Sequence, residues 1–210
     1  MRIALINGSP KAKQSTSASI LTDLKIALSE NAEIIQAELH KAVISEKDLE
    51  ELRACDTLVF AYPLYVDGIP AHLLSCLMAL ENAPWQDRRV RVYGIVNCGF
   101  YEGIQAEPAL KVLENWCVKA GFLWSGGIGI GGGGALAQMP HVKNGHGPKA
   151  PVAKALRTLA DSILQNEAQK NHYVSIAFPR FLYKLAAQMG WRQMVKQNGG
   201  RARDLGKRWE

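Results

Sequence analysis

Short apolar runs alternate with amphipathic segments along the first three quarters of the chain. The runs have the length of buried strands and lie at residues 3–6, 34–39, 57–62, 90–96 and 122–124. Helices are predicted at residues 20–28, 46–54, 70–80, 107–120 and 151–165, of which the helix at residues 46–54 is short and polar. Strands that alternate with helices predict a parallel sheet covered by helices on both faces.

Three loops that follow predicted strands contain most of the candidate chemistry, at residues 8–17, 63–70 and 97–103. In a parallel sheet such loops meet at the carboxyl edge, where ligands bind. The first loop is rich in hydroxyls and leads into a helix. Its hydroxyl and N–H donors, together with the positive end of the helix, suit a phosphate group. The alternative is an ordinary strand–helix turn with a capped helix. The loop lacks the glycine–lysine–serine/threonine pattern of a nucleoside triphosphate site.

The second and third loops supply aromatic side chains and glycines beside this phosphate site. They read Pro63-Leu64-Tyr65-Val66-Asp67-Gly68-Ile69-Pro70 and Asn97-Cys98-Gly99-Phe100-Tyr101-Glu102-Gly103. Aromatic faces stack on flat rings, and backbone groups bind polar ring edges. The three loops together predict a site for a phosphorylated planar ring.

These motifs, in this order, resemble the flavodoxin-like flavoproteins. The likeness is to the NAD(P)H-dependent FMN reductases and their iron–sulfur flavoprotein relatives, and it covers residues 1–165. Gly8-Ser9-Pro10 with Ser15 and Ser17 is similar to the family's FMN-phosphate loop, and the second and third loops are similar to those along the ring. The iron–sulfur relatives have a tight cysteine cluster that this chain lacks, so we expect no cluster.

The resemblance implies a three-layer α/β sandwich around a five-stranded parallel sheet of order 2-1-3-4-5. It also implies noncovalent FMN, flanked by Tyr65 and Phe100, with Asn97 bonded to the ring edge. The flavin would carry the chemistry, so no catalytic side chain is expected. The cofactor-binding residues that it implies are Ser9, Lys11, Ser15, Thr16, Ser17, Pro63, Leu64, Tyr65, Asp67, Gly68, Asn97, Gly99 and Phe100. For Asp67, beside a glycine, a role in the turn is an equal alternative.

By resemblance, the protein would be an FMN-dependent oxidoreductase that passes electrons from NADPH or NADH to a small-molecule or protein acceptor. Two alternatives stay open. One is a flavodoxin-type electron carrier without nicotinamide turnover, and the other is a flavin-free scaffold or regulator with the same fold.

The four cysteines are widely spaced, without a C-x-x-C pair, and are therefore not expected to bind a metal. Cys98 lies in a candidate flavin loop, but without a partner base it is better interpreted as a small buried side chain. Seven glycines fall within residues 126–134. They predict a flexible loop at the mouth of the site, with disorder or a dinucleotide-binding fingerprint as alternatives.

The chain has no long apolar run, and its N-terminus enters a strand at once, which predicts a cytoplasmic protein. All of the formal charge of +6 falls in the last 40 residues, which contain eight Lys or Arg against Asp204 and Glu210. We expect a domain at residues 1–168 and a basic helical extension at residues 169–210, with a helix that begins near Pro179 and is interrupted at Gly190.

Three interpretations of this extension compete: packing on its own domain or a dimer mate, contact with an anionic membrane, and docking of an acidic redox partner. The first, with a homodimer, was favoured from the sequence. Nucleic-acid binding is not expected, because the sequence contains no recognisable nucleic-acid-binding motif.

Overall fold

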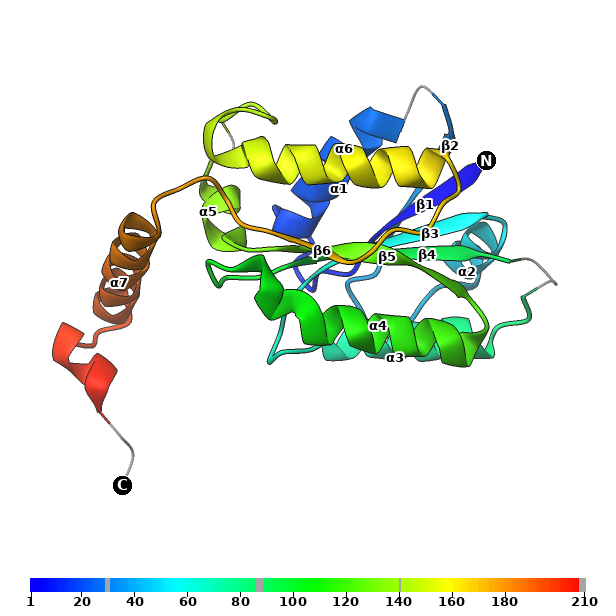
Figure 1. Ribbon diagram of the computed structural model, residues 1–210. Helices are drawn as coiled ribbons and strands as arrows, with labels where there is room; N and C mark the ends of the chain where they lie inside the picture. The colour runs from blue at the N-terminus through cyan, green and yellow to red at the C-terminus, as the bar shows by residue number, and fades with distance from the viewer. Residues whose placement is uncertain (29–30, 86–88, 140, 208–210) are drawn as a thin grey trace. The chain divides into compact units, whose positions relative to one another are not determined.

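The computed structural model describes residues 1–28, 31–85, 89–139 and 141–207. Its centre is one parallel sheet of six strands in the order β2-β1-β3-β4-β5-β6 (Figure 1). The strands are β1 (Arg2–Asn7), β2 (Glu33–Glu38), β3 (Thr57–Pro63), β4 (Arg91–Asn97), β5 (Leu123–Ile130) and β6 (His172–Val174). The order 2-1-3-4-5 expected from the family resemblance is confirmed, with one further strand at the β5 edge.

Helices cover both faces of the sheet, as the alternation of elements predicted. The α-helices of this part are α1 (Thr16–Leu28), α2 (Glu46–Arg53), α3 (Ala71–Asn82), α4 (Glu107–Ala120), α5 (Gly133–Gln138) and α6 (Ala150–Leu164). Short 3-10 turns are η1 (Gly103–Ala106) and η2 (Gly147–Lys149). Helices α1 and α6 lie on one face of the sheet, and α3 and α4 lie on the other (Figure 1).

The core follows from the alternation of side chains along buried strands. Leu58, Phe60 and Tyr62 of β3 point to the side of α3 and α4 and join one cluster with Leu73 and Leu77 of α3. Every residue of β3 before Pro63 is buried. A strand that is covered on both faces is apolar at nearly every position, which is why the sequence pattern of β3 is continuous rather than alternating.

Strand β6 was not predicted, and it moves the boundary of the folded part. His172–Val174 pairs in parallel with Ile128–Ile130. The chain divides into two compact units, Met1–Ile176 and Ala177–Glu210, rather than after residue 168. Tyr173 and Val174 favour strands, but three residues are too few to predict one, so pairing with β5 determines their conformation.

The glycine-rich segment is structured, and the prediction of a flexible loop was wrong. Gly126, Gly127 and Gly129 lie inside β5, and helix α5 begins at Gly133. A Cβ on Gly129 would lie 2.5 Å from the carbonyl oxygen of Gly103, in η1. Glycine is therefore required here because the backbone of η1 packs directly against the strand.

The second unit contains the predicted C-terminal helix, α7 (Arg180–Gln197), and a 3-10 turn, η3 (Ala202–Gly206). Helix α7 begins after Pro179, as expected, but continues through Gly190 without interruption. The charged residues Arg208 and Glu210 lie outside the described residues.

Candidate functional site

The three predicted loops surround one open cavity of about 240 Å³ at the carboxyl edge of the sheet. The register places Asn7 of β1 beside Glu38 of β2 and Ala61 of β3, and Pro63 of β3 beside Asn97 of β4. The strands therefore end together, and their loops converge. The cavity is lined by Ser9, Lys11, Ser15, Thr16, Ser17, Pro63, Leu64, Tyr65, Asn97, Cys98, Gly99, Gly133 and Gly134.

Three buried serines of the first loop have the same hydrogen-bond arrangement. The Oγ of Ser9 accepts a bond from the amide of Lys11 (3.2 Å), and the Oγ of Ser15 accepts one from the amide of Ala18 (3.0 Å). The Oγ of Ser17 accepts one from the side chain of Asn97 (2.8 Å). No described residue accepts a hydrogen bond from any of these hydroxyls. All three retain a proton that can be donated to a ligand in the cavity.

The N-terminus of α1 adds further donors to this wall. Ser15 is its capping residue through the bond from Ala18, so the sequence prediction of cap hydroxyls is confirmed for this serine. The first amides of a helix have no partner within the helix, and they carry partial positive charge. No acidic residue lies in the first turn of α1. An anion at this position would meet hydroxyls and amides without a competing carboxylate.

Asn97 connects three elements at the base of the cavity. Its Nδ2 donates to Ser17 Oγ of α1 (2.8 Å) and to the carbonyl oxygen of Tyr62 in β3 (3.1 Å). The side chain is buried, and both donor positions of its amide are used. Asn97 therefore holds α1 against the ends of β3 and β4, and its hydrogen bond to a ring edge stays a prediction.

A second layer of polar residues lies beneath the first loop. Asn7 Nδ2 donates to Glu38 Oε2 (2.7 Å), and Asn7 Oδ1 accepts from the amide of Ser9 (3.1 Å). His40 Nδ1 lies 2.7 Å from the carbonyl oxygen of Ser9, and His40 Nε2 lies 2.9 Å from Glu38 Oε2. These contacts turn the Ser9 carbonyl away from the cavity. The sequence analysis missed Glu38 and His40, because only the fold places the end of β2 beside the first loop.

The second loop forms a two-residue turn. Tyr65 and Gly68 exchange backbone hydrogen bonds of 3.1 and 3.0 Å, and the central residues Val66 and Asp67 have φ of 47° and 55°. Positive φ at both central positions is the type I′ geometry. It is unfavourable for a β-branched residue such as Val66, which is fully exposed. Asp67 therefore has the turn role that the sequence analysis left open.

The third loop is tied to the segment after β5. The amide of Gly133 donates to the carbonyl oxygen of Cys98 (2.8 Å), and Thr16 Oγ1 donates to the carbonyl oxygen of Gly133 (3.3 Å). Burial raises the pKa of the Cys98 thiol, and its hydrogen bond with Phe100 opposes this only in part. The thiol is therefore mainly protonated at neutral pH, which agrees with its interpretation as a buried small side chain rather than a nucleophile.

Ten of the thirteen candidate residues line the cavity, and Asp67, Gly68 and Phe100 do not. Phe100 is 54% exposed and Tyr65 is 45% exposed, so both have surface available for a ligand. The structure adds Cys98, Gly133 and Gly134 to the lining. Their segment was predicted to lie at the mouth of the site, but neither glycine was named as a cofactor-binding residue.

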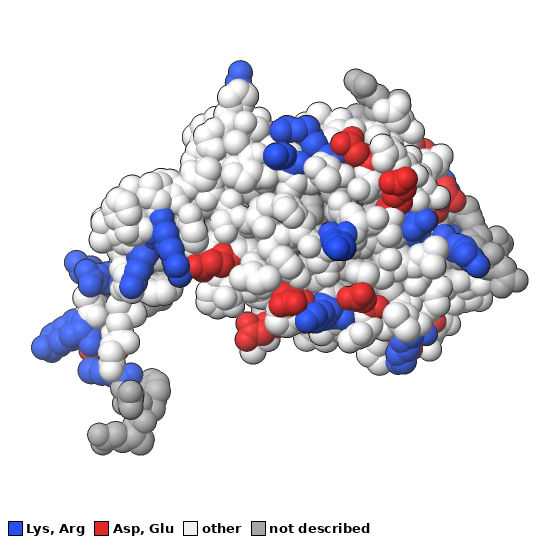
Figure 2. Space-filling view, viewed as in Figure 1, with Lys and Arg blue, Asp and Glu red and all other residues white. Residues whose placement is uncertain are grey.

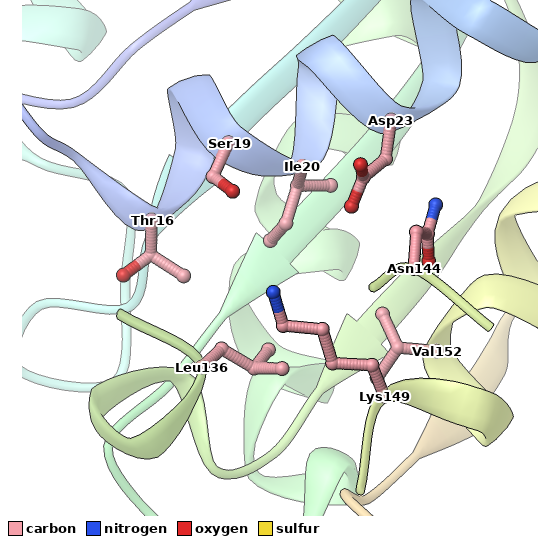
Figure 3. A pocket seen from close by; sticks show the side chains of 8 residues that line it. All are labelled: Thr16, Ser19, Ile20, Asp23, Leu136, Asn144, Lys149 and Val152. Atoms are coloured by element: carbon pink, nitrogen blue, oxygen red, sulfur yellow. The ribbon is translucent and has the colours of Figure 1, made fainter. Parts of the chain in front are cut away.

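A second cavity lies between α1 and α6 and is lined in part by Asp23 and Lys149 (Figure 3). Burial raises the pKa of the Asp23 carboxyl, and the charge of Lys149 opposes this shift. The cavity has a volume of about 20 Å³, which is room for roughly one water molecule. It is too small for a cofactor.

Across the described ranges, no group of three or more His, Cys, Asp and Glu side chains is arranged to hold a metal ion. No helix within those ranges is long and apolar enough to cross a membrane.

The fold matches a known class of proteins. Residues 1–75 match the family model described as flavodoxin-like fold, and the chain has a flavodoxin-like fold. The sequence matches none of the curated proteins.

Solved structures with this architecture include an NAD(P)H:quinone oxidoreductase from Methanothermobacter marburgensis. It has 15% sequence identity and a TM-score of 0.56, and the match covers 78% of this chain and 96% of that one. An azoreductase from Bacillus anthracis strain Sterne has 16% identity and a TM-score of 0.52, with coverage of 79% and 99%. An FMN-dependent NADH-azoreductase from Bacillus anthracis strain Ames Ancestor, in complex with FMN, has 14% identity and a TM-score of 0.52, with coverage of 78% and 100%.

Proposed function

We propose that the cavity binds FMN through its phosphate group, and that the protein is an NAD(P)H-dependent flavin oxidoreductase. The observation that carries the proposal is the set of three buried serine hydroxyls in the first loop and at the N-terminus of α1. Each oxygen already accepts a hydrogen bond from the protein, and each proton has no acceptor among the described residues. These hydroxyl protons are free to be donated into the cavity, and an anionic phosphate would accept all three hydrogen bonds.

The remaining cavity residues fit the rest of this cofactor. Lys11 supplies a positive charge near the phosphate position, and Pro63, Leu64 and Gly99 of the second and third loops line the same cavity, where a ribityl chain and a ring edge would lie. The exposed faces of Tyr65 and Phe100 can pack against a flat ring. When bound, FMN would accept a hydride from NADH or NADPH and pass the electrons to a small-molecule or protein acceptor. The side chains of the site are therefore assigned to binding and orientation.

The solved neighbours support the same class of activity. They include an NAD(P)H:quinone oxidoreductase and azoreductases, and one of these structures is a complex with FMN. Their sequence identities of 14–16% show a shared fold, so cofactor and activity in this chain rest on the serine arrangement.

The phosphate assignment is tested by comparing FMN with riboflavin, which lacks the phosphate. The wild type is expected to bind FMN more tightly than riboflavin, measured by quenching of flavin fluorescence. Ser15→Ala should reduce this preference about fivefold to tenfold, the equivalent of about 1 kcal/mol for one charge-assisted hydrogen bond. Ser45→Ala is the matched control, because Ser45 also caps a helix, α2, away from the cavity. An equal affinity of the wild type for both flavins would refute the phosphate assignment.

The oxidoreductase assignment is tested by anaerobic addition of NADH or NADPH to the FMN-loaded protein. Bleaching of the flavin absorbance by either nicotinamide alone is expected. A flavin that is bound but is reduced only through an added reductase would instead show an electron carrier. Absence of flavin binding would leave a scaffold or regulator with this fold.

A further inference from the structure

The C-terminal unit, Ala177–Glu210, exposes most of its apolar side chains. No residue of α7 is buried, and Phe181, Leu185 and Met189 are 72%, 56% and 62% exposed. Isolated exposed apolar side chains are common on soluble proteins, but several on one helix mark a contact surface. Within the C-terminal unit itself, the described residues leave these apolar side chains uncovered.

These apolar residues share one side of α7 with basic residues. Phe181, Leu185, Met189, Arg192 and Lys196 are spaced by four, four, three and four positions. Such spacing places all five along one side of a helix. The first half of this stripe is apolar and the second half is cationic. Leu182 lies beside the apolar half of the stripe and widens it. The apolar half of the stripe does not continue beyond Gly190.

The charge of the whole chain is concentrated in the same unit. Residues 177–210 contain eight Lys or Arg and two acidic residues, whereas residues 1–176 contain equal numbers of each. Figure 2 shows Lys and Arg gathered over α7 and the residues that follow it, and acidic and basic side chains interspersed over the rest of the visible surface. The occupant of the stripe should therefore be anionic.

A second copy of the chain does not meet this requirement. Two tails of the same positive charge would repel each other, and the first unit has no net charge with which to attract them. The sequence favoured packing of the helix on its own domain or on a dimer mate, and the dimer mate lacks this complementarity of charge.

We infer that the stripe of α7 docks on an anionic phospholipid surface. Phe181, Leu182, Leu185 and Met189 would enter the boundary between headgroups and acyl chains. Arg192 and Lys196, with Arg203 of η3, would contact the lipid phosphates. A stripe that combines apolar and cationic side chains matches a surface whose charge lies directly above hydrocarbon. Because no described helix can span a bilayer, the contact is peripheral. The inference does not depend on the proposed oxidoreductase activity.

The test is flotation of the full-length protein with lipid vesicles. Binding is expected to vesicles that contain phosphatidylglycerol but not to pure phosphatidylcholine, and to fall as salt is raised. The double variant Arg192→Glu with Lys196→Glu should weaken binding at least about tenfold. The control reverses two exposed charges of α6 instead, Lys154→Glu with Arg157→Glu. It has the same net charge and should bind as the wild type does.

Two further measurements separate lipid from the other occupants. Phe181→Ser with Leu185→Ser should also release the protein from anionic vesicles. If this variant binds as well as the wild type, the contact is purely electrostatic, as expected for an acidic protein partner, and the inference is wrong. The inference also fails if the wild type does not bind anionic vesicles. It fails as well if light scattering shows that the wild type is a dimer and that Phe181→Ser with Leu185→Ser dissociates this dimer.

Discussion

The close packing of η1 on β5 makes a graded set of glycine substitutions informative. A Cβ on Gly129 would lie 2.5 Å from the carbonyl oxygen of Gly103 and 2.7 Å from a ring carbon of Tyr173. A Cβ on Gly94 would lie 2.9 Å or more from its neighbours, all of them atoms of side chains. A Cβ on Gly99 would meet nothing within 4 Å. None of the three glycines has positive φ.

The expected loss of stability depends on which atoms must move to make room for the added Cβ. Overpacking of a buried site costs about 1–3 kcal/mol. Alanine also lowers the conformational entropy of the unfolded chain relative to glycine, which stabilises the folded state by about 0.4–1 kcal/mol. For Gly129→Ala the obstacle is backbone, so we expect a net loss of about 2 kcal/mol. Gly94→Ala, where leucine ends can rotate, should lose about 1 kcal/mol. Gly99→Ala should stay within about 0.5 kcal/mol of the wild type.

Urea denaturation followed by far-ultraviolet circular dichroism measures these differences in the free energy of unfolding. A loss of about 2 kcal/mol corresponds to a fall in melting temperature of about 4–8 °C for a chain of this size. Gly129→Ala should also weaken FMN binding, because a displaced η1 carries the third loop with it. If Gly129→Ala is as stable as Gly99→Ala, the packing of η1 on β5 is not as described.

Three further substitutions test other parts of the fold. Val66→Asn should raise the free energy of unfolding by about 1 kcal/mol in thermal denaturation, because asparagine tolerates positive φ better than valine. Asn97→Ala removes two buried hydrogen bonds and should lower the free energy of unfolding by about 2 kcal/mol in urea denaturation. Asp23→Asn should stabilise the protein at neutral pH. Burial raises the pKa of Asp23, so the folded wild type loses stability as this group ionises. The melting temperatures of the wild type and of Asp23→Asn should coincide below pH 3.8, the ordinary pKa of an Asp carboxyl. They should diverge as the pH rises through the raised pKa of Asp23.

Each of these has a result that would contradict it. A destabilised Val66→Asn would mean that the turn is not strained. For Asn97, the control is Asn82→Ala, which removes an exposed bond to the carbonyl oxygen of Met78 and should change stability by less than about 0.5 kcal/mol. Equal losses for the two asparagine variants would contradict the role assigned to Asn97. A difference between Asp23→Asn and wild type that is constant with pH would exclude titration of Asp23 as its cause.

The parts of the fold that the sequence predicted are those that local patterns specify. The apolar run at residues 57–62 is long enough to be a buried strand in any context, and Ser15 before an amphipathic segment is a helix cap by its local chemistry. The three loops were placed at one edge because all parallel strands present the same end there.

The parts that were missed depend on neighbours distant in the chain. Gly129 disfavours a strand by itself, and only the backbone of η1 explains it. His172 and Tyr173 become a strand because the edge of β5 is free to pair. His40 lies beside Ser9 through the pairing of β1 with β2, a contact between residues 31 positions apart. No local pattern contains such information.

The arrangement of the three serines also bears on how a ligand would be captured. The hydroxyl oxygens of Ser9, Ser15 and Ser17 are fixed by donors from the protein itself. Their rotamers are therefore restricted when the chain folds, before any ligand arrives. Ordering side chains at the moment of binding costs about 0.5–1.5 kcal/mol for each immobilised group, and a site that is already ordered avoids this loss. Recognition at this wall is thus preorganised, and capture of an anion would not have to wait for a loop to close.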